Sequence, residues 1–599
     1  MSYKDRLRSY IDVAHYGYVR KWLALSIIIG AAAGVGSIVF YWAIQQATRL
    51  MLGLGAGYTP PLPAGEGPTI FSPAALPWMI PIITAVGGLI SGLLVFKFAP
   101  EAEGHGTDAA IDAFHNKGGL IRRRVPIVKV FASAITIGSG GSAGREGPTA
   151  QIAAGVGSAL ADLFKLSTRD RRIAVAAGIG AGIGAIFSAP LGGAVLSMEI
   201  LYRRDFETEA LLPSFIASVV GYCIFGSWHG WMPVFGLVSA PTFNRVEELL
   251  GYIVLGIVCG LVGNMYGRGF YFIRDLFRKM RIPNWVKPAI GGLIVGGIGV
   301  FLPQILGVGY GWVQFAIDGD FTLLPLGILV AVIFGKILAT SLSIGSGGSG
   351  GVFAPGLVIG GMTGATLWML LHNVTTFIPG SPESFVVVGM MALFGGIAKA
   401  PVAVILMVTE MTNAYTLLVP SMLACGIAYF VSMNSYIYEN QVADRSESPA
   451  HRSEHSIPLL QILKVQQAML TNITTIYART PIAQVSVTMK ANKIDAIPVI
   501  DNYGGLVGIV SASDIARTNP DKYATITVDK IMKTKLIVVH PDDSLNKALQ
   551  TMTQHDIRHL PVVKRDKPRQ MIGMVTMNDI MSCHKKETAN AFGYKKSLE

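Results

Sequence analysis

Long apolar runs constrain the fold of this chain more than any other feature of its sequence. They include residues 22–50, 76–98, 247–268, 287–304, 322–344 and 416–434. A run of about 18 or more apolar residues is typical of a helix that crosses a lipid bilayer. Only 14% of the residues are charged and the mean hydropathy is +0.49, so the chain is too apolar for a soluble protein. The sequence therefore predicts an integral membrane protein, and the lipid membrane is one of its partners.

The basic residues indicate which parts face the cytoplasm. The charged stretch before the first apolar run contains Lys4, Arg6, Arg8, Arg20 and Lys21. Both this stretch and the run that follows are too long for a cleaved secretory signal. Because positive charges stay on the cytoplasmic side, we expect a cytoplasmic N-terminus in the cell (inner) membrane. The net charge of +12 suggests further cytoplasmic loops at Arg122, Arg123, Arg124, Arg169, Arg171 and Arg172.

Other classes of protein leave sequence marks that are missing here. Nucleic-acid binding would require a basic soluble face with readout elements. The cysteines, Cys223, Cys259, Cys425 and Cys583, have no paired spacing that would indicate a zinc site or a disulfide framework. An enzyme would require a nucleophile with its base, a metal cluster or a dinucleotide-binding turn. We therefore expect no enzymatic activity, no metal, no required cofactor and no nucleic-acid partner.

The composition changes once along the chain. Residues 1–439 are apolar and rich in glycine, whereas polar and charged residues predominate from Asn440 to about Ile457, so we expect a linker over 440–465. From 466 to 583 short strand-like runs alternate with amphipathic helical patterns, which is typical of a soluble α/β domain. Residues 584–599 form a short C-terminal tail. We expect the whole C-terminal part to be cytosolic.

The membrane part contains an internal duplication. Residues 137–148 read Ile-Gly-Ser-Gly-Gly-Ser-Ala-Gly-Arg-Glu-Gly-Pro, and residues 344–355 read Ile-Gly-Ser-Gly-Gly-Ser-Gly-Gly-Val-Phe-Ala-Pro. Lys129 and Lys336 precede the two turns at the same distance. An Ala-Pro pair followed by a glutamate, Glu199 or Glu410, also occurs twice. Because two independent motifs repeat at nearly one offset, the domain is built from two related halves.

The duplicated glycine-rich turns predict an anion site. The apolar segments around them, such as 149–164, 173–186 and 383–399, are short, and broken segments at corresponding places in two halves point to a transport site. A glycine-rich turn that opens a helix presents unpaired N–H groups and the positive end of the helix dipole. Two such turns facing each other would replace part of the hydration shell of a small anion, and amides bind weakly enough to release it.

Glu146 is the unusual residue of the first turn. A charged carboxylate at the start of a helix competes with an anion for the same N–H groups, and a protonated one can move away. An ionisable side chain inside a membrane segment indicates function, so we interpret Glu146 as a gate. The alternative is a structural salt bridge between Glu146 and Arg145.

These motifs resemble the CLC family of chloride channels and transporters. The resemblance rests on Gly-Arg-Glu-Gly-Pro at 144–148, Gly-Val-Phe-Ala-Pro at 351–355 and the Ile-Tyr pair at 437–438, and it covers residues 20–440. It implies an all-α polytopic membrane protein of two inverted-topology repeats with broken or re-entrant helices, which forms a homodimer with one pore per subunit. By position, Glu146 would be the gating glutamate, and chloride would be held by the backbones of Arg145, Glu146, Gly147, Val352, Phe353 and Ala354 and by the Tyr438 hydroxyl.

One departure from the family concerns anion binding. The family's first anion motif, Gly-Ser-Gly-Ile-Pro, is replaced here by Gly-His-Gly-Thr-Asp at 104–108. His105 takes the place of the serine. Its ring could donate an N–H to the anion, or it could only fill space beside a binding backbone. Selectivity for chloride is therefore implied by the resemblance alone.

A second departure concerns protons. Proton-coupled relatives often carry two adjacent acids after the Ala-Pro motif, and the second accepts protons from the cytoplasm. Here Glu199 matches the first acid, and Ile200 replaces the second. Because an isoleucine cannot take up a proton, the sequence favours channel-like or uncoupled flow. The alternatives are a Cl⁻/H⁺ exchanger that uses Glu199 or a water chain, and a sensor that binds anions without passing them.

The C-terminal part is itself duplicated. Ile-Pro-Val-Ile at 497–500 leads to Gly508, and Leu-Pro-Val-Val at 560–563 leads to Gly573. Each reads as strand, turn, strand and then a helix opening at Ser511 or Thr576, which resembles a tandem CBS pair over about 466–583. That resemblance implies binding of ATP, ADP or AMP through the hydroxyl–aspartate pairs, Ser511 with Asp514 and Thr576 with Asp579. The alternative is that both pairs are only helix caps.

Overall fold

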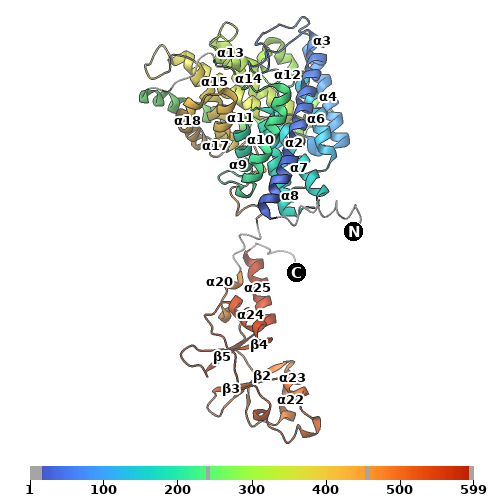
Figure 1. Cartoon of the computed structure of the whole chain (residues 1–599), viewed down its shortest axis with the longest axis vertical. Helices are drawn as coiled ribbons and strands as arrows, with labels where there is room; N and C mark the ends of the chain where they lie inside the picture. Colours follow the sequence, from blue (N-terminus) through green and yellow to red (C-terminus); the bar gives the residue numbers. More distant parts are fainter. Residues whose placement is uncertain (1–16, 238–242, 244, 452–458, 592–599) are drawn as a thin grey trace. The chain divides into compact units, whose positions relative to one another are not determined.

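The computed structural model describes residues 17–237, 243, 245–451 and 459–591. The chain divides into two compact units, Met1–His451 and Arg452–Glu599 (Figure 1). Part of the predicted N-terminal charge cluster (Lys4, Arg6, Arg8), residues 452–458 of the predicted linker and residues 592–599 of the predicted tail lie outside the described residues.

The first unit is helical and has two halves with the same order of elements. The first half contains α2 (Tyr18–Thr48), which runs through a π-helical turn into α3 (Leu54–Ala56), then α4 (Met79–Phe98), α5 (Thr107–Asn116), α6 (Arg124–Gly138), α7 (Glu146–Leu163), α8 (Thr168–Ile186), α9 (Pro190–Glu199) and α10 (Leu211–His229). The second contains α11 (Leu249–Lys279), α12 (Lys287–Phe301), α13 (Tyr310–Ile317), α14 (Leu326–Gly345), α15 (Phe353–Leu371), α16 (Glu383–Ala398), α17 (Pro401–Thr412) and α18 (Leu418–Val431).

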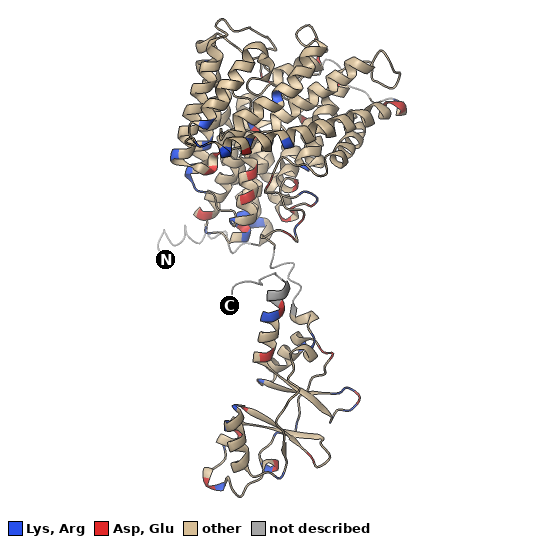
Figure 2. Cartoon of the chain, turned by 180° about the vertical axis from the view of Figure 1, so that it is seen from behind, with Lys and Arg blue, Asp and Glu red and all other residues tan. Residues whose placement is uncertain are grey.

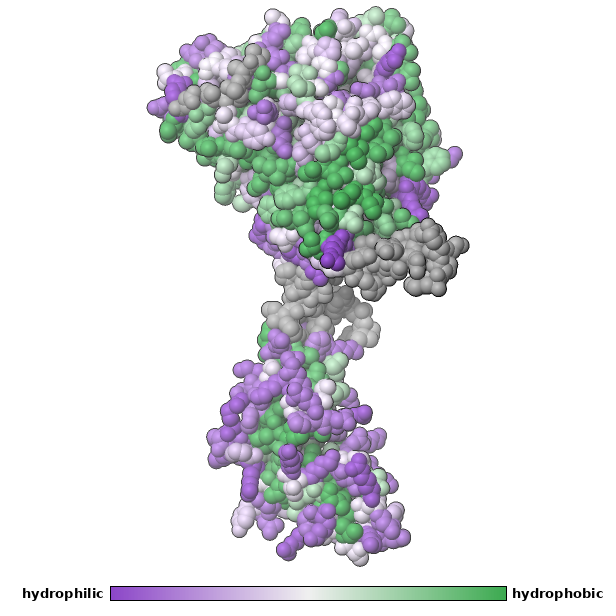
Figure 3. Space-filling view, viewed as in Figure 1, coloured by the Kyte–Doolittle hydropathy of each residue, from purple (hydrophilic) through white to green (hydrophobic). Residues whose placement is uncertain are grey.

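The surface of this unit fits a lipid environment. Among the described residues, six helices are long and apolar enough to cross a membrane. Large apolar side chains such as Trp42, Phe272 and Phe430 are exposed on their outer faces, and Figure 3 shows a broad hydrophobic area over the helices. Such an exposed apolar surface would be unfavourable in water. The predicted polytopic membrane fold of two inverted halves is confirmed.

Several helices are short because they begin inside the unit. α9 and α17 each start at a proline, which suits the first helical position since its missing N–H would be unpaired there. α5 and α13 follow Gly106 (φ +73°) and Gly309 (φ +91°). A backbone with such positive φ favours glycine. The first residues of α5, α7, α13 and α15 are all buried, so these four helix N-termini lie within the unit instead of at its surface.

One end of the unit collects its basic clusters. In Figure 2, most of the ribbon coloured for charged residues in the first unit lies toward its lower end, the end at which α2 begins in Figure 1. There Lys21 Nζ lies 2.7 Å from Asp170, and Arg172 donates to the Ala450 carbonyl at 3.0 Å. The start of α2, the arginines in the first turns of α8 and the segment leading to the second unit therefore share one end.

Residues 440–451, predicted as the start of the linker, belong to the first compact unit. Gln441 Nε2 donates to the carbonyls of Ile200 and Ala398 at 3.0 and 2.9 Å. His451 Nε2 lies 2.7 Å from Glu207 Oε2, which also accepts from the Tyr202 hydroxyl at 2.6 Å. The linker boundaries themselves stay a prediction.

The second unit repeats one small α/β motif. The first copy contains β1 (Ile476–Tyr477), α22 (Ile482–Asn492), β2 (Ala496–Ile500), β3 (Leu506–Ser511) and α23 (Ala512–Ala516), and the second contains α24 (Leu545–Gln554), β4 (His559–Val563), β5 (Met571–Thr576) and α25 (Met577–Ala591), with the short α20 (Leu459–Ile462) and α21 (Val465–Ala468) before them. β2 pairs antiparallel with β3 and parallel with β1; β4 pairs antiparallel with β5. Each copy has its own apolar core. The predicted strand–turn–strand–helix pattern is confirmed.

Candidate functional site

The two glycine-rich turns meet at the centre of the first unit. Gly144 and Gly351 exchange two backbone hydrogen bonds, each 2.7 Å long, as in a minimal antiparallel bridge. A Cβ at Gly351 would press on the Gly144 carbonyl and the Gly147 amide. Because only glycine allows this approach, α7 and α15 begin side by side with their N-terminal amides close together. The structure thus brings together the two turns that the sequence singled out.

The Glu146 carboxylate lies between these helix starts. Its side chain is buried, with an exposed fraction of 2%. Oε2 accepts a hydrogen bond from the Ala354 amide at 3.2 Å, and Oε1 accepts one from the Tyr310 hydroxyl at 2.8 Å. A carboxylate that begins α7 therefore takes up an N-terminal amide of α15, in the other half of the unit.

Arg145 belongs to a different network. Its guanidinium forms a nearly buried ion pair with Glu66, in which Nη1 lies 3.0 Å from Glu66 Oε2. The same carboxylate oxygen accepts from the Tyr41 hydroxyl at 3.0 Å. The guanidinium also lies 5.0 Å from the ring centre of Tyr41 and 5.7 Å from that of Tyr310. The alternative of a structural salt bridge between Arg145 and Glu146 does not describe this arrangement, because the partner of Arg145 is Glu66.

His105 and Tyr438 lie together on another side of the centre. Their ring centres are 5.4 Å apart, and both side chains are buried. His105 Nδ1 is a buried nitrogen without a hydrogen-bond partner among the described residues. Such an unpaired polar atom is costly and calls for a partner that the protein itself does not supply. Val352 is fixed nearby through its carbonyl, which accepts from the Tyr266 hydroxyl at 2.8 Å.

Each of the duplicated lysines donates hydrogen bonds to the carbonyls of the loop before a short helix, in the same way in both halves. Lys129 Nζ donates to the carbonyls of Ala102 and Gly104 at 2.9 and 2.8 Å, ahead of α5. Lys336 Nζ donates to those of Ile305 and Gly307 at 2.9 and 2.8 Å, ahead of α13. Both amines are fully buried. They hold the loops that precede the two short helices, so they position the site and are not themselves aimed at an anion.

The duplicated glutamates cap each other's helices. Glu199, at the end of α9, accepts from the amides of Val402 and Ala403 at the start of α17, at 3.2 and 2.6 Å. Glu410, in α17, accepts from the amides of Leu191 and Gly192 at the start of α9, at 3.1 and 2.7 Å. Ile200 follows Glu199 and is buried. Glu199 therefore has a structural partner, which the sequence did not predict.

In the second unit both hydroxyl–aspartate pairs form capping boxes. Ser511 Oγ lies 2.5 Å from Asp514 Oδ2, which also accepts the Ser511 amide at 3.0 Å. Thr576 Oγ1 lies 2.7 Å from Asp579 Oδ2, which accepts the Thr576 amide at 2.9 Å. These bonds satisfy the helix starts without a ligand. The geometry thus fits the helix-cap alternative.

His559 lies near the second of these pairs. Burial lowers the pKa of the His559 imidazole, and the carboxylates of Asp495 and Asp579 oppose that shift. Asp495 belongs to the first copy of the motif and Asp579 to the second. The Leu506 amide also donates to the Arg569 carbonyl at 2.8 Å. The two copies therefore face each other, with the His559 imidazole and the carboxylates of Asp495 and Asp579 close together.

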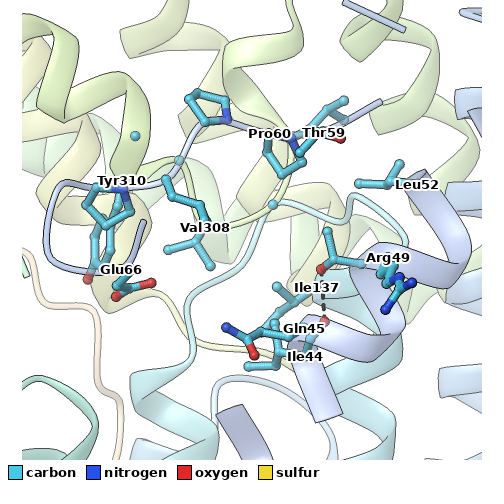
Figure 4. A pocket seen from close by; sticks show the side chains of 18 of the residues that line it. Ile44, Gln45, Arg49, Leu52, Thr59, Pro60, Glu66, Ile137, Val308 and Tyr310 are labelled. Atoms are coloured by element: carbon cyan, nitrogen blue, oxygen red, sulfur yellow. Dashed lines mark hydrogen bonds between the residues drawn. The ribbon is translucent and has the colours of Figure 1, made fainter. Parts of the chain in front are cut away.

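A cavity of about 370 Å³ adjoins the central network. It is lined mostly by apolar residues from the end of α2, the loop after α3 and the loop before α13. Glu66 and Tyr310 lie on one side of it and Gln45 and Arg49 on the other (Figure 4). It lies near Arg145 and at the far end of α2 from Tyr18, so it belongs to the end of the unit remote from the basic clusters.

The sequence did not point to Tyr310 and Glu66, the residues that contact Glu146 and Arg145 at the centre of the unit. Tyr310 starts a short helix after Gly309, as Thr107 does after Gly106, and extending the internal duplication would have found it. Glu66 lies in a loop of the first half without any repeated motif, so no sequence signal pointed to it. In the described parts of the chain, no group of three or more His, Cys, Asp or Glu side chains could hold a metal ion.

Comparisons with known proteins agree with this geometry. A family model described as voltage gated chloride channel matches residues 87–433, and the model of the CBS domain matches residues 465–520 and 528–585. A ClcB-like protein of Ralstonia nicotianae is 31% identical over 68% of this chain and 92% of its own length. The H(+)/Cl(-) exchange transporter ClcA of Citrobacter koseri is 29% identical over 73% and 92%. The solved structure of a slow cyanobacterial Cl⁻/H⁺ antiporter matches with a TM-score of 0.62 at 26% identity, covering 70% of this chain and 96% of that one.

Proposed function

Because this chain belongs to the CLC family of chloride channels and transporters and moves anions across a membrane, we propose that it carries chloride along a path gated by Glu146. One observation carries this proposal. The Glu146 carboxylate accepts the Ala354 amide at the start of α15, which is the kind of group that would bind a small anion. A charged Glu146 therefore competes with the anion for the same donor.

The gate works by exchange at this amide. When Glu146 is charged, its carboxylate occupies the helix start and blocks the anion. When it is protonated, the carboxyl loses most of its attraction to the amide and to the helix dipole, and chloride replaces it. The anion is then held by the backbones of Arg145, Glu146, Gly147, Val352, Phe353 and Ala354 and by the Tyr438 hydroxyl. The unpaired Nδ1 of His105 supports direct donation to the anion by this ring.

The gate is tested by removing its charge. We expect Glu146→Gln and Glu146→Ala to weaken or abolish the pH dependence of chloride flux, because neither side chain competes as an anion. Purified protein in liposomes would be assayed from acidic to neutral pH. A Glu146→Ala variant that keeps the wild-type pH profile would show that Glu146 is not the gate.

We propose that the flow is uncoupled from protons. A coupled proton needs titratable groups or connected water along its path, and Ile200 is a buried apolar side chain at the position where coupled relatives often carry the inner acid. Glu199, its neighbour, is engaged in capping α17. These two observations support channel-like transport.

Cl⁻/H⁺ exchange is the second candidate, because relatives with the names of exchangers and antiporters match most of this chain. The reversal potential under crossed chloride and pH gradients separates the two. Uncoupled flow predicts that it follows the chloride gradient alone. Chloride-driven proton uptake that vanishes in Glu199→Gln would instead identify an exchanger that uses Glu199, and uptake that survives this substitution would require a water path.

The remaining proposals concern assembly and regulation. We propose a homodimer in the cell inner membrane, divided into a membrane domain (1–439), a linker (440–465), a CBS pair (466–583) and a tail (584–599). The basic clusters share one end of the membrane unit with residues 450–451, which supports a cytoplasmic N-terminus and CBS pair. ATP, ADP or AMP is proposed to bind the CBS pair at Ser511, Asp514, Thr576 and Asp579 and to modulate the pore.

A further inference from the structure

Tyr310 joins the gate carboxylate to the second half of the membrane unit. Its hydroxyl donates to Glu146 Oε1 at 2.8 Å, and both side chains are buried. Tyr310 lies outside both glycine-rich turns and outside the motifs that carry the family resemblance. It therefore adds to the gate a contact that those motifs do not contain.

The hydroxyl comes from a rigid position. Tyr310 is the first residue of α13, and the loop before it is held by the buried Lys336 amine. One turn later, Gln314 exchanges hydrogen bonds with the backbone of Gly236 at 3.0 and 2.8 Å. The ring packs edge-on against Phe235, with the ring centres 5.2 Å apart. A side chain supported in this way places a donor accurately.

Several groups face Glu146 from the elements packed around it. Arg145 precedes it in the chain, Tyr266 approaches from α11, and Tyr438 comes from the end of the membrane domain. Arg145 is compensated by Glu66, and the Tyr266 hydroxyl is used by the Val352 carbonyl. Tyr310 is the tyrosine whose hydroxyl is bonded to the carboxylate itself.

We propose that Tyr310 is a positioning residue of the gate, whose O–H holds the Glu146 carboxylate on the Ala354 amide. The inference rests on the proposed gating role of Glu146. A hydrogen bond to a charged acceptor is stronger than one to a neutral carboxyl. Tyr310 therefore stabilises the charged, blocking form more than the protonated form, and it sets the pH at which the gate opens.

The first test is Tyr310→Phe, which removes the donor and keeps the ring. We expect the midpoint of acid activation of chloride flux to move to higher pH by about one unit, with several-fold more flux at neutral pH. Tyr252→Phe is the matched control. Tyr252 is a buried tyrosine of α11 that packs on Phe385, so its removal should leave the midpoint unchanged. In a Glu146→Gln background, Tyr310→Phe should have no further effect on the pH profile.

A second variant acts in the opposite direction. A 3-fluorotyrosine incorporated at position 310 is a more acidic donor of nearly the same size, so it should hold the charged carboxylate more strongly. We expect the activation midpoint to move to lower pH. If thermal unfolding shows that Tyr310→Phe does not fold, the 3-fluorotyrosine variant alone tests the proposal. A loss of packing would not move the activation midpoint to lower pH.

The outcomes distinguish this proposal from the gate itself. If Glu146→Gln abolishes the pH dependence while both Tyr310 variants keep the wild-type midpoint, the gate stands and the role of Tyr310 is overturned. If Glu146→Gln keeps the wild-type pH profile of chloride flux, both the gating role of Glu146 and the positioning role of Tyr310 are wrong. Opposite shifts in the two Tyr310 variants, absent from Tyr252→Phe, support the proposal.

Discussion

Arg145 and Glu146 are neighbours in the chain, yet their charged groups bind different partners. Glu66 compensates Arg145 in a nearly buried ion pair, and the guanidinium forms its ion pair with Glu66 and not with the gate carboxylate. Removing one partner of a buried pair leaves an uncompensated charge, which commonly costs about 3–5 kcal/mol. Glu66 thus serves both the stability of the membrane unit and the freedom of Glu146 to exchange with an anion.

Glu66→Gln tests this separation. Without the negative charge of Glu66, Arg145 should attract the Glu146 carboxylate and stabilise its charged form. We expect a lower thermal unfolding temperature and an acid-activation midpoint that moves to lower pH, measured by flux into liposomes. Glu101→Gln removes the partner of Arg122 from an exposed pair and is the control, with a change of about 1 kcal/mol or less. If the pH midpoint of acid activation is unchanged in Glu66→Gln, Arg145 does not stabilise the charged form of Glu146.

Single residues differ in how far the sequence could predict them. Lys129, Lys336, Glu199 and Glu410 were found because they repeat at corresponding places in both halves. The duplication could not say what they contact, because the lysines bond to loop carbonyls and the glutamates to helices of the opposite half. Glu66 could not be found at all, since its partner lies 79 residues away and neither local pattern nor spacing links a loop carboxylate to it.

At the scale of elements, the N-terminal amides of the helices form both the proposed anion site and the contacts between the two halves. At the centre, the start of α15 donates its Ala354 amide to the gate carboxylate Glu146, whereas the starts of α9 and α17 donate to Glu410 and Glu199. The sequence predicted the short helices, since α7, α8 and α16 follow the expected segments 149–164, 173–186 and 383–399 closely. It could not predict which helix starts are filled by side chains and which remain for an anion, because that depends on contacts between the halves.

The reciprocal caps can be tested as a matched pair. Glu410→Gln and Glu199→Gln each remove a carboxylate from two helix amides, and a lost cap costs about 0.5–2 kcal/mol. We expect both variants to lower the thermal unfolding temperature by a similar amount and to leave the pH profile of chloride flux unchanged. If Glu199→Gln alters proton movement and Glu410→Gln does not, Glu199 has a transport role beyond its cap.

At the scale of the whole molecule, the chain joins a membrane unit and a CBS pair through residues that pack on the former. Gln441, which follows Tyr438 closely in the chain, is held by the Ile200 carbonyl at the end of α9, and His451 is held by Glu207 in the segment after that helix. The sequence predicted the two-part organisation from a change of composition. It could not predict that residues 440–451 would pack so closely, because polar composition alone reads as a linker.

Nucleotide binding is the prediction that belongs to this scale. We expect ATP, ADP or AMP to bind the full-length protein in calorimetry, and Asp514→Ala or Asp579→Ala to weaken binding by about 1.5–3 kcal/mol through the lost hydrogen bond to a charged acceptor. Ser544→Ala, which removes the cap of α24, is the control for lost capping alone. No heat with any of the three at millimolar concentration would leave Ser511 and Thr576 as helix caps only.

The mutual capping of α9 and α17 makes each half a matching surface for the other. Each half carries both the carboxylate and the helix start that receives it, so the surface of one half is complementary to a second copy of itself. This is the property of an isologous interface in a two-fold dimer. The gate breaks this equivalence, because Glu146 stands in one half and Phe353 at the matching place in the other.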